Sequence, residues 1–227
     1  MRENPAESME MPFPSSQEVA RLLPGFLHSL NNPLCTMINS IAFLQEDLGD
    51  EARGPQTVRE LQRTTESVVQ TVAGMQLFAR DVTNAASRLS VDKLLDLAIQ
   101  LVRPLYHMQG GRITADIEGS FARFAPPQAG HFLRAMTLLL MNTLEIMSPP
   151  PALRLQARRD GSEADTVFCC KFSLPSRLEL EEVPQRFRRC EILCQKLAGR
   201  LLIQDGEVGC LQFEIRIPLP TSGVFLD

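Results

Sequence analysis

The chain has 227 residues, enough for one large domain or two small ones with a proper core. Apolar residues make up 44% and charged residues 22%, and the net charge of -4 without a long basic run gives no reason to expect nucleic acid as a partner. No apolar run approaches the roughly 20 residues of a membrane-spanning helix. Because residues 1–20 are polar and unlike a secretory signal, we expect a cytoplasmic protein with no membrane partner.

Residues 15–88 are expected to form a helical hairpin behind a flexible tail, residues 1–14. Ser15 or Ser16 can cap the first helix. Two stripes of mostly apolar residues recur at steps of three and four, which is the spacing of one helix face. They are Leu23, Phe26, Leu30, Leu34, Met37, Ile41, Leu44 and Leu48, then Val58, Leu61, Thr65, Val68, Val72, Met75, Ala79 and Val82.

The segment 49–55 contains Gly and Pro and supplies the turn between the two helices. The second stripe is a heptad seam. Two helices with one seam each bury those seams poorly alone, whereas two hairpins together make a four-helix bundle. The pattern therefore predicts a homodimer.

Residues 89–227 are expected to form an α/β sandwich domain, so the fold class is α+β. Helical periodicity alternates here with short stretches of strand pattern. The expected order is helix 91–107, strand 112–118, helix 128–147, strands 153–158 and 166–173, helix 183–198, and strands 200–205 and 210–218.

The cysteines lack the paired spacing of a metal site, and only three His are available to complete one. We therefore expect no metal ligands and free thiols in a reducing compartment. Small apolar core residues are the usual role of such cysteines. Cys190 and Cys194, four residues apart, can share one helix face.

The segment His28-Ser29-Leu30-Asn31-Asn32-Pro33-Leu34 is unusual inside an amphipathic helix, because an interior Pro costs about 3 kcal/mol. On a helical wheel His28 lies opposite the apolar stripe, and Asn32 lies one turn further along the same face. This segment closely resembles the phosphoacceptor motif of bacterial sensor histidine kinases. The resemblance implies a dimerisation hairpin followed by a kinase-type ATP domain.

Several positions depart from the kinase pattern. Of the two Asn that hold Mg²⁺-ATP in the family, only Asn142 is kept, since Leu138 stands at the first position. The Asp-x-Gly-x-Gly turn is absent after Ser173, and residues 174–190 contain no Gly. Ser29 replaces the acid that usually follows the His. Since phosphate cradles need Gly, we expect a reduced domain that binds no ATP.

The pattern that remains is similar to that of phosphorelay histidine phosphotransferases. That resemblance implies phosphate exchange between His28 and aspartates of response-regulator receiver domains, with Asn32 orienting an oxygen or a water. It implies no cofactor of its own, because Mg²⁺ would come with the receiver. Leu27, Asn31, Cys35 and Asn39 are expected to form the docking patch.

Two alternatives stay open, so enzymatic activity is not fixed by the sequence. The chain can be a scaffold that binds receivers without chemistry, or a receiver phosphatase in which Asn32 positions the water. Phosphotransfer requires His28, a phosphatase requires Asn32 more, and a scaffold requires neither. His107 at a helix end and His131 in a first helical turn are assigned no role.

Overall fold

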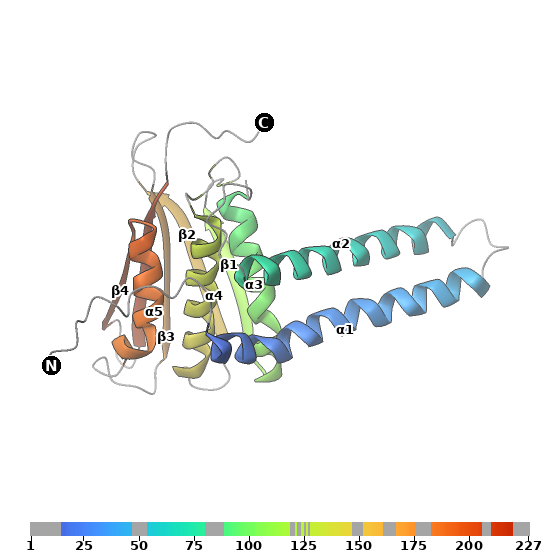
Figure 1. Cartoon of the computed structure of the whole chain (residues 1–227), viewed down its shortest axis with the longest axis horizontal. Helices are drawn as coiled ribbons and strands as arrows, with labels where there is room; N and C mark the ends of the chain where they lie inside the picture. Colours follow the sequence, from blue (N-terminus) through green and yellow to red (C-terminus); the bar gives the residue numbers. More distant parts are fainter. Residues whose placement is uncertain are drawn as a thin grey trace, which may run out of the picture.

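The computed structural model describes residues 15–46, 54–79, 89–118, 128–146, 152–160, 167–175, 183–205 and 210–219, with Phe121, Phe124 and Pro126. Two long helices project from a sheet that is covered by shorter helices (Figure 1). The predicted tail 1–14 and most of the predicted turn 49–55 lie outside the described residues. So does the segment 80–88, which precedes the expected domain boundary.

The projecting pair is the predicted helical hairpin, with α1 at Ser16–Glu46 and α2 at Gly54–Ala79. A capping box starts α1: the Glu18 N–H donates to Ser15 Oγ at 3.2 Å, and the Ser15 N–H donates to Glu18 Oε2 at 2.8 Å. The helix continues through Pro24 and Pro33. None of the described helices is long and apolar enough to cross a membrane.

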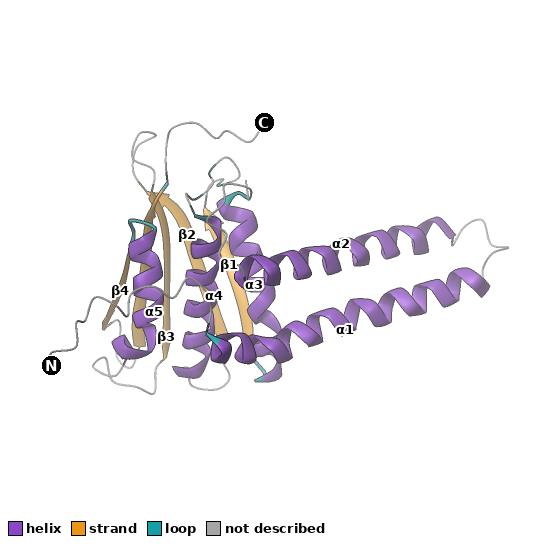
Figure 2. Cartoon of the chain, viewed as in Figure 1, coloured by secondary structure: helices purple, strands orange, loops and turns teal. Residues whose placement is uncertain are grey.

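The remaining elements follow the predicted order. They are α3 (Val91–Met108), β1 (Arg112–Glu118), α4 (Ala129–Ile146), β2 (Ala152–Asp160), β3 (Val167–Pro175), α5 (Val183–Lys196), β4 (Arg200–Asp205) and β5 (Cys210–Pro218). The strands form one mixed sheet in the order β1-β2-β3-β5-β4, in which only β1 and β2 pair in parallel. Figure 2 shows the helices of this part lying together against the sheet.

The main core lies between one face of the sheet and α3, α4 and α5. Aromatic rings fill its centre: the Phe168 ring packs edge-on against Phe121 and Phe132, with ring centroids 5.4 and 5.2 Å apart. Cys170, Cys190 and Cys194 belong to this core, as expected of small apolar residues. Burial raises the pKa of the Cys170 and Cys194 thiols to about 12, so both stay protonated at neutral pH.

The foot of the hairpin belongs to the same core. Leu22 of α1 and Phe78 of α2 are fully buried and cluster with residues of α3 and α4. The Arg134 Nε of α4 also donates a hydrogen bond to the Phe78 carbonyl at 2.8 Å. Further out, three residues of the predicted first stripe, Leu23, Leu34 and Ile41, are 43–46% exposed in the single chain. The outer hairpin therefore presents apolar surface that one chain does not cover.

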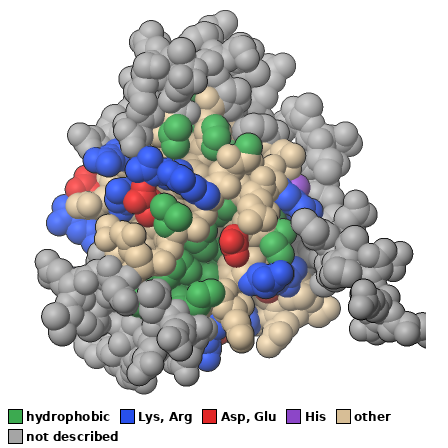
Figure 3. All heavy atoms as spheres, turned by 90° about the vertical axis from the view of Figure 1, so that its left-hand side faces the viewer, with side chains coloured by type: hydrophobic (Ala, Val, Ile, Leu, Met, Phe, Trp, Pro, Cys, Tyr) green, Lys and Arg blue, Asp and Glu red, His purple; other side chains and the backbone are tan. Residues whose placement is uncertain are grey.

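The other face of the sheet is polar. Arg154, Gln156 and Arg158 of β2 are exposed, and neighbouring strands add Lys171, Glu214 and Arg216. The carboxylate of Glu214 pairs with Lys171 at 2.9 Å and with Arg216. Figure 3 views the end of the molecule opposite the hairpin tip, where several Lys and Arg side chains gather in one band. The open face of the sheet is therefore charged, whereas the face covered by α3, α4 and α5 is apolar.

Replacing Glu214 by Gln is expected to reduce the acid dependence of stability. Burial alone would raise the pKa of Glu214, but hydrogen bonds and charge from Lys171 and Arg216 outweigh it and hold the pKa at about 2. Because this pKa lies below the unfolded value of about 4.3, the ion pairs stabilise the fold above about pH 4.3. That contribution is lost as the pH falls towards 2. Urea unfolding at a series of pH values should show a smaller loss for the variant; equal losses would contradict this assignment.

Candidate functional site

His28 lies on α1 just above the junction between the hairpin and the rest of the chain. Gly25, one turn earlier, packs against Leu105 of α3: a Cβ added to Gly25 would lie 3.1 Å from the Leu105 side chain. His28 itself is exposed, as the helical wheel predicts. The His28 imidazole is therefore presented to solvent one helical turn beyond the contact between α1 and α3.

The imidazole of His28 is hydrogen bonded to Asn32, one turn further along α1. The Asn32 Nδ2 lies 3.1 Å from the His28 Nε2, and both side chains are exposed. With the amide nitrogen turned to the ring, Asn32 donates and Nε2 accepts, which places the ring proton on Nδ1. A nucleophilic His needs a free lone pair on the attacking nitrogen, and this tautomer has that lone pair on Nε2. Asn32 thus orients the ring, and it must turn aside before Nε2 can attack.

The predicted docking residues surround this pair. Leu27, Asn31, Cys35 and Asn39 are all exposed, and Leu27 is exposed to 48%. Successive residues of a helix are about 100° apart. Leu27 therefore lies on the neighbouring face, in line with Leu34, whereas Cys35 and Asn39 share the side of His28. The expectation of core cysteines does not hold for Cys35, because it lies on the exposed side of α1 that also carries His28.

A polar cavity of about 360 Å³ opens between α1 and α2 next to this face. Asn39 lines it from α1, and Gln56, Thr57 and Glu60 line it from α2. The α2 residues were absent from the sequence-based site, because the sequence does not say which turn of α2 faces which turn of α1. Glu60 is the acidic residue in this lining, and it belongs to the cavity rather than to the His28–Asn32 pair.

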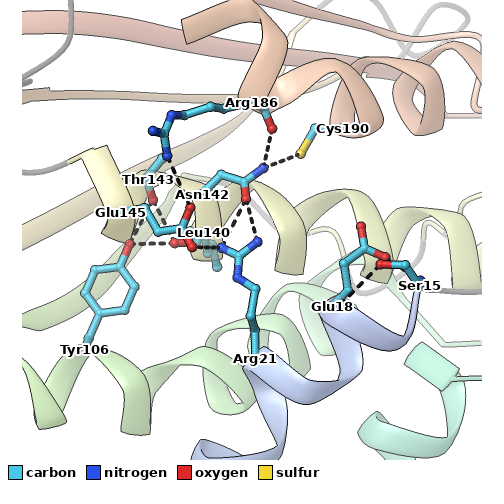
Figure 4. A network of polar contacts seen from close by, with 10 residues as sticks. All are labelled: Ser15, Glu18, Arg21, Tyr106, Leu140, Asn142, Thr143, Glu145, Arg186 and Cys190. Atoms are coloured by element: carbon cyan, nitrogen blue, oxygen red, sulfur yellow. Dashed lines mark hydrogen bonds and ion pairs between the residues drawn. The ribbon is translucent and has the colours of Figure 1, made fainter.

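Asn142 of α4 is the centre of a second group of polar residues, shown in Figure 4. Its Oδ1 accepts hydrogen bonds from both terminal nitrogens of Arg21, each at 3.3 Å. Its Nδ2 donates to the Arg186 carbonyl at 2.8 Å and lies 3.8 Å from the Cys190 sulfur. The buried amide is therefore satisfied by three partners within the chain, as expected of a structural polar residue.

The side-chain amide of Asn142 is engaged on both its oxygen and its nitrogen by partners within the chain. The resemblance gives Asn142 the position of an Asn that helps hold Mg²⁺-ATP, but here the guanidinium of Arg21 occupies the carbonyl side of its amide. Leu138, at the position of the other Asn, is only 3% exposed. The stretch 176–182, part of the Gly-free segment, lies outside the described residues.

We predict that the protein does not bind ATP. Calorimetry with Mg²⁺-ATP at millimolar concentration should give no saturable heat, because a cationic side chain already holds the Asn142 carbonyl and no second Asn is present. Binding tighter than about 100 μM, or roughly 5.5 kcal/mol, would contradict this reading of the second domain. Magnesium chloride without nucleotide serves as the control titration.

The remaining candidates are possible metal ligands and the two other histidines, His107 and His131. Within the described residues no three His, Cys, Asp or Glu side chains lie close enough to hold a metal ion. His107 is exposed in the last turn of α3. His131 lies in the first turn of α4, where its Nδ1 contacts Gln128 Oε1. Neither residue is close enough in sequence to His28 to share its helix.

Glu18 and Arg21 were missed as site residues by the sequence analysis. Glu18 pairs with Arg189 of α5 at 2.7 Å, and Arg21 pairs with Glu145 of α4 at 2.5 Å. The available signal was two opposite charges three residues apart among the apolar positions of the first two turns of α1. Their partners lie more than 120 residues further along the chain, where no local pattern points back to them.

Comparison with known proteins finds chains of similar structure, all at low sequence identity. The histidine kinase AdeS of Acinetobacter baumannii matches 85% of this chain and 98% of its own, with a TM-score of 0.47 and 9% identity. A bacterial phosphotransferase matches 91% and 100%, with a TM-score of 0.41 and 12% identity. The catalytic domain of the histidine kinase ThkA matches 59% and 95%, with a TM-score of 0.46 and 11% identity. No protein-family model and no curated protein matches the sequence.

The chain is thus similar in structure to histidine kinases and to a bacterial phosphotransferase over most of its length. The sequence identity is low throughout, so the similarity concerns the fold alone. The expected resemblance is confirmed at that level, and the chemistry has to be argued from the residues of this chain.

Proposed function

We propose that the protein is a histidine phosphotransferase, which exchanges phosphate between His28 and the phosphoaspartate of response-regulator receiver domains. The observation that carries this proposal is the exposed His28–Asn32 pair on the outer face of α1, with Nε2 as the hydrogen-bond acceptor. A second support is the Arg21–Asn142 contact, which leaves the amide unavailable to a nucleotide. The proposal therefore takes a phosphorylated receiver domain as the phosphate donor.

The reaction requires little of this chain besides position. The lone pair of the His28 Nε2 attacks the phosphorus of the acyl phosphate in line, the N–P bond forms, and the P–O bond breaks. The bonding electrons leave with the aspartate carboxylate, and Nδ1 keeps its proton during the attack. The charge on the phosphoryl oxygens is balanced by the receiver's Mg²⁺. Since positioning supplies most of the catalysis in phosphoryl transfer, a single exposed and oriented imidazole suffices.

The proposal includes a homodimer held together by the outer hairpin. Leu23, Leu34, Ile38 and Ile41 of α1 are 43–66% exposed and recur along one side of the helix. Large contiguous apolar surfaces on single chains usually mark an interface. A second hairpin would cover the stripe and complete a four-helix bundle. The stripe lies about 100° around α1 from His28, so dimerisation leaves the imidazole accessible.

A receiver phosphatase is the second candidate, and the exposed amide of Asn32 favours it. An amide one turn from an imidazole on an open helix face can hold a water as readily as it holds Nε2. In that reaction the water attacks phosphorus and Asn32 matters more than His28. The two functions differ in whether phosphate is ever bound to this chain.

The test of the proposal is incubation of the protein with a receiver that carries radioactive phosphoaspartate. A phosphotransferase acquires label that is stable in base and labile in acid, as a phosphohistidine is. Loss of receiver label as free phosphate, without labelled protein at any time, would favour the phosphatase. If the receiver keeps its label as long with this protein as without it, the protein would be a scaffold without chemistry.

A further inference from the structure

The contact between the foot of α1 and the covering helices α4 and α5 is ionic and directional. Glu18 is only 8% exposed at its side chain and pairs with Arg189 at 2.7 Å. Arg21 bridges Asn142 and Glu145, and Glu145 also pairs with Arg186 at 3.6 Å. Figure 4 shows Arg21 reaching from α1 towards the group on α4. We name these contacts of Glu18 and Arg21 the ionic latch.

Most other contacts of the described part of the junction are apolar, apart from the hydrogen bond that the Arg134 Nε donates to the Phe78 carbonyl at 2.8 Å. Leu22 and Phe78 are buried in the shared core, where attraction does not depend on direction. Gly25 and Gly74 let α1 and α2 approach α3 closely, since a Cβ at either would lie 3.1 or 3.2 Å from a Leu side chain. Close apolar packing does not by itself specify one angle, and the Arg134 hydrogen bond holds only the end of α2. The latch supplies the directional contacts of α1 with α4 and α5.

The angle matters because of what lies beside His28. A stable protein interface buries about 800 Å² on each partner, far more than one helical turn supplies. A receiver that extends from His28 towards the junction also covers the adjoining end of α3, whose Leu105 packs against Gly25. Met108 at that end is 65% exposed. A docked partner would thus contact two parts of the chain whose relative position depends on the latch.

We propose that Glu18 and Arg21 are positioning residues: their ionic latch fixes the hairpin on the α/β domain, so that His28 and the end of α3 form one docking surface of constant geometry. The role in transfer rests on the proposed function, whereas the fixed angle does not. In this proposal the latch, rather than a bound ligand, holds the hairpin against the α/β domain. It requires no cofactor, because Arg21 provides the positive charge at Asn142 from within the chain.

The angle can be measured with two spin labels. The native Cys35 is exposed on α1, and Gln195→Cys places a second thiol on the exposed side of α5. Cys210→Ser removes a further thiol, and the four other cysteines are buried. Labelled protein is diluted with unlabelled protein, so that each pair of labels belongs to one chain. The distance distribution is recorded for the wild type and for latch variants in this background.

Arg21→Met removes the charge and keeps the length of the side chain, and Glu145→Gln opens the latch from the other side. Both should shift or broaden the distribution. Phosphate uptake at saturating receiver should fall about tenfold, because misplacement by about 1 Å can cost up to 100-fold. Arg21→Lys should restore uptake in part, since one ammonium cannot reach both partners as the guanidinium does. Arg63→Met, on the exposed side of α2, is the matched control and should change neither measurement.

An unchanged distance distribution in Arg21→Met and Glu145→Gln would overturn the latch, whatever the transfer rate. A changed distribution with wild-type uptake would overturn the shared docking surface. If the wild type takes up no phosphate, the proposed function fails, and the label distances still decide whether the latch fixes the hairpin. A single thermal transition in each variant shows that the fold is kept.

Discussion

Replacement of His28 by Ala is expected to abolish phosphate uptake from a phosphorylated receiver and to leave the fold intact. The variant removes the nucleophilic nitrogen from the exposed face of α1, and Ala is the best helix former. Receiver binding should stay within about tenfold, or 1.4 kcal/mol, because the surrounding docking residues remain. The measurement is acid-labile phosphate on the protein over time, together with receiver affinity by calorimetry.

Two further variants separate the possible roles of this face. Asn32→Ala frees Nε2 from its hydrogen bond and should slow uptake less than His28→Ala does. If Asn32→Ala slows dephosphorylation of the receiver more than His28→Ala does, the result would favour the phosphatase. His107→Ala is the matched control, because His107 is also exposed and lies on another helix. Phosphate found on His107 or His131 in place of His28 would end the central proposal.

A charged residue in the exposed stripe of α1 should split the dimer into folded monomers. Leu34→Asp and Ile41→Asp place a carboxylate where side chains that are 43% and 46% exposed would pack against a second hairpin. A buried, unpaired charge costs about 3–5 kcal/mol, and two-fold symmetry places it in the interface twice. The dissociation constant should therefore rise by more than about a thousandfold.

Sedimentation at micromolar concentration measures this change. The wild type should have about twice the chain mass of 25.3 kDa, and the variants should have that mass once. Cys35→Asp, next to Leu34 but on another side of α1, should remain dimeric. A monomeric wild type would exclude the four-helix bundle. Met75 is unsuitable for this test, because it packs against the core of its own chain, where a charge would unfold the monomer.

The elements of this fold were predictable because each is a local pattern. Steps of three and four residues predict α1 and α2, and the strands β1, β4 and β5 have the predicted bounds. The start of α1 follows from Ser15 and Glu18, which form a capping box within four residues. In such patterns the interacting partners are neighbours in the chain, so the sequence contains the whole interaction.

The His28 face was also predictable, for the same reason. His28 and Asn32 are four residues apart on one helix, and that spacing alone brings the two side chains within hydrogen-bonding distance. The exposure of Leu27, Asn31 and Cys35 follows from their angle around the same helix. The sequence could not say how Asn32 is turned, since its amide can bond to the ring, to water or to a partner.

The tertiary structure alone decided how the hairpin meets the α/β domain. Arg21 and Asn142 are 121 residues apart, and their contact requires α1 to cross α4 at one particular turn. No local pattern in the sequence identifies Arg21 as the cation that bonds to the Asn142 amide. Helix periodicity fixes which side of a helix is buried. It does not fix which residues of another helix lie opposite, because packing in three dimensions sets the angle and offset between helices.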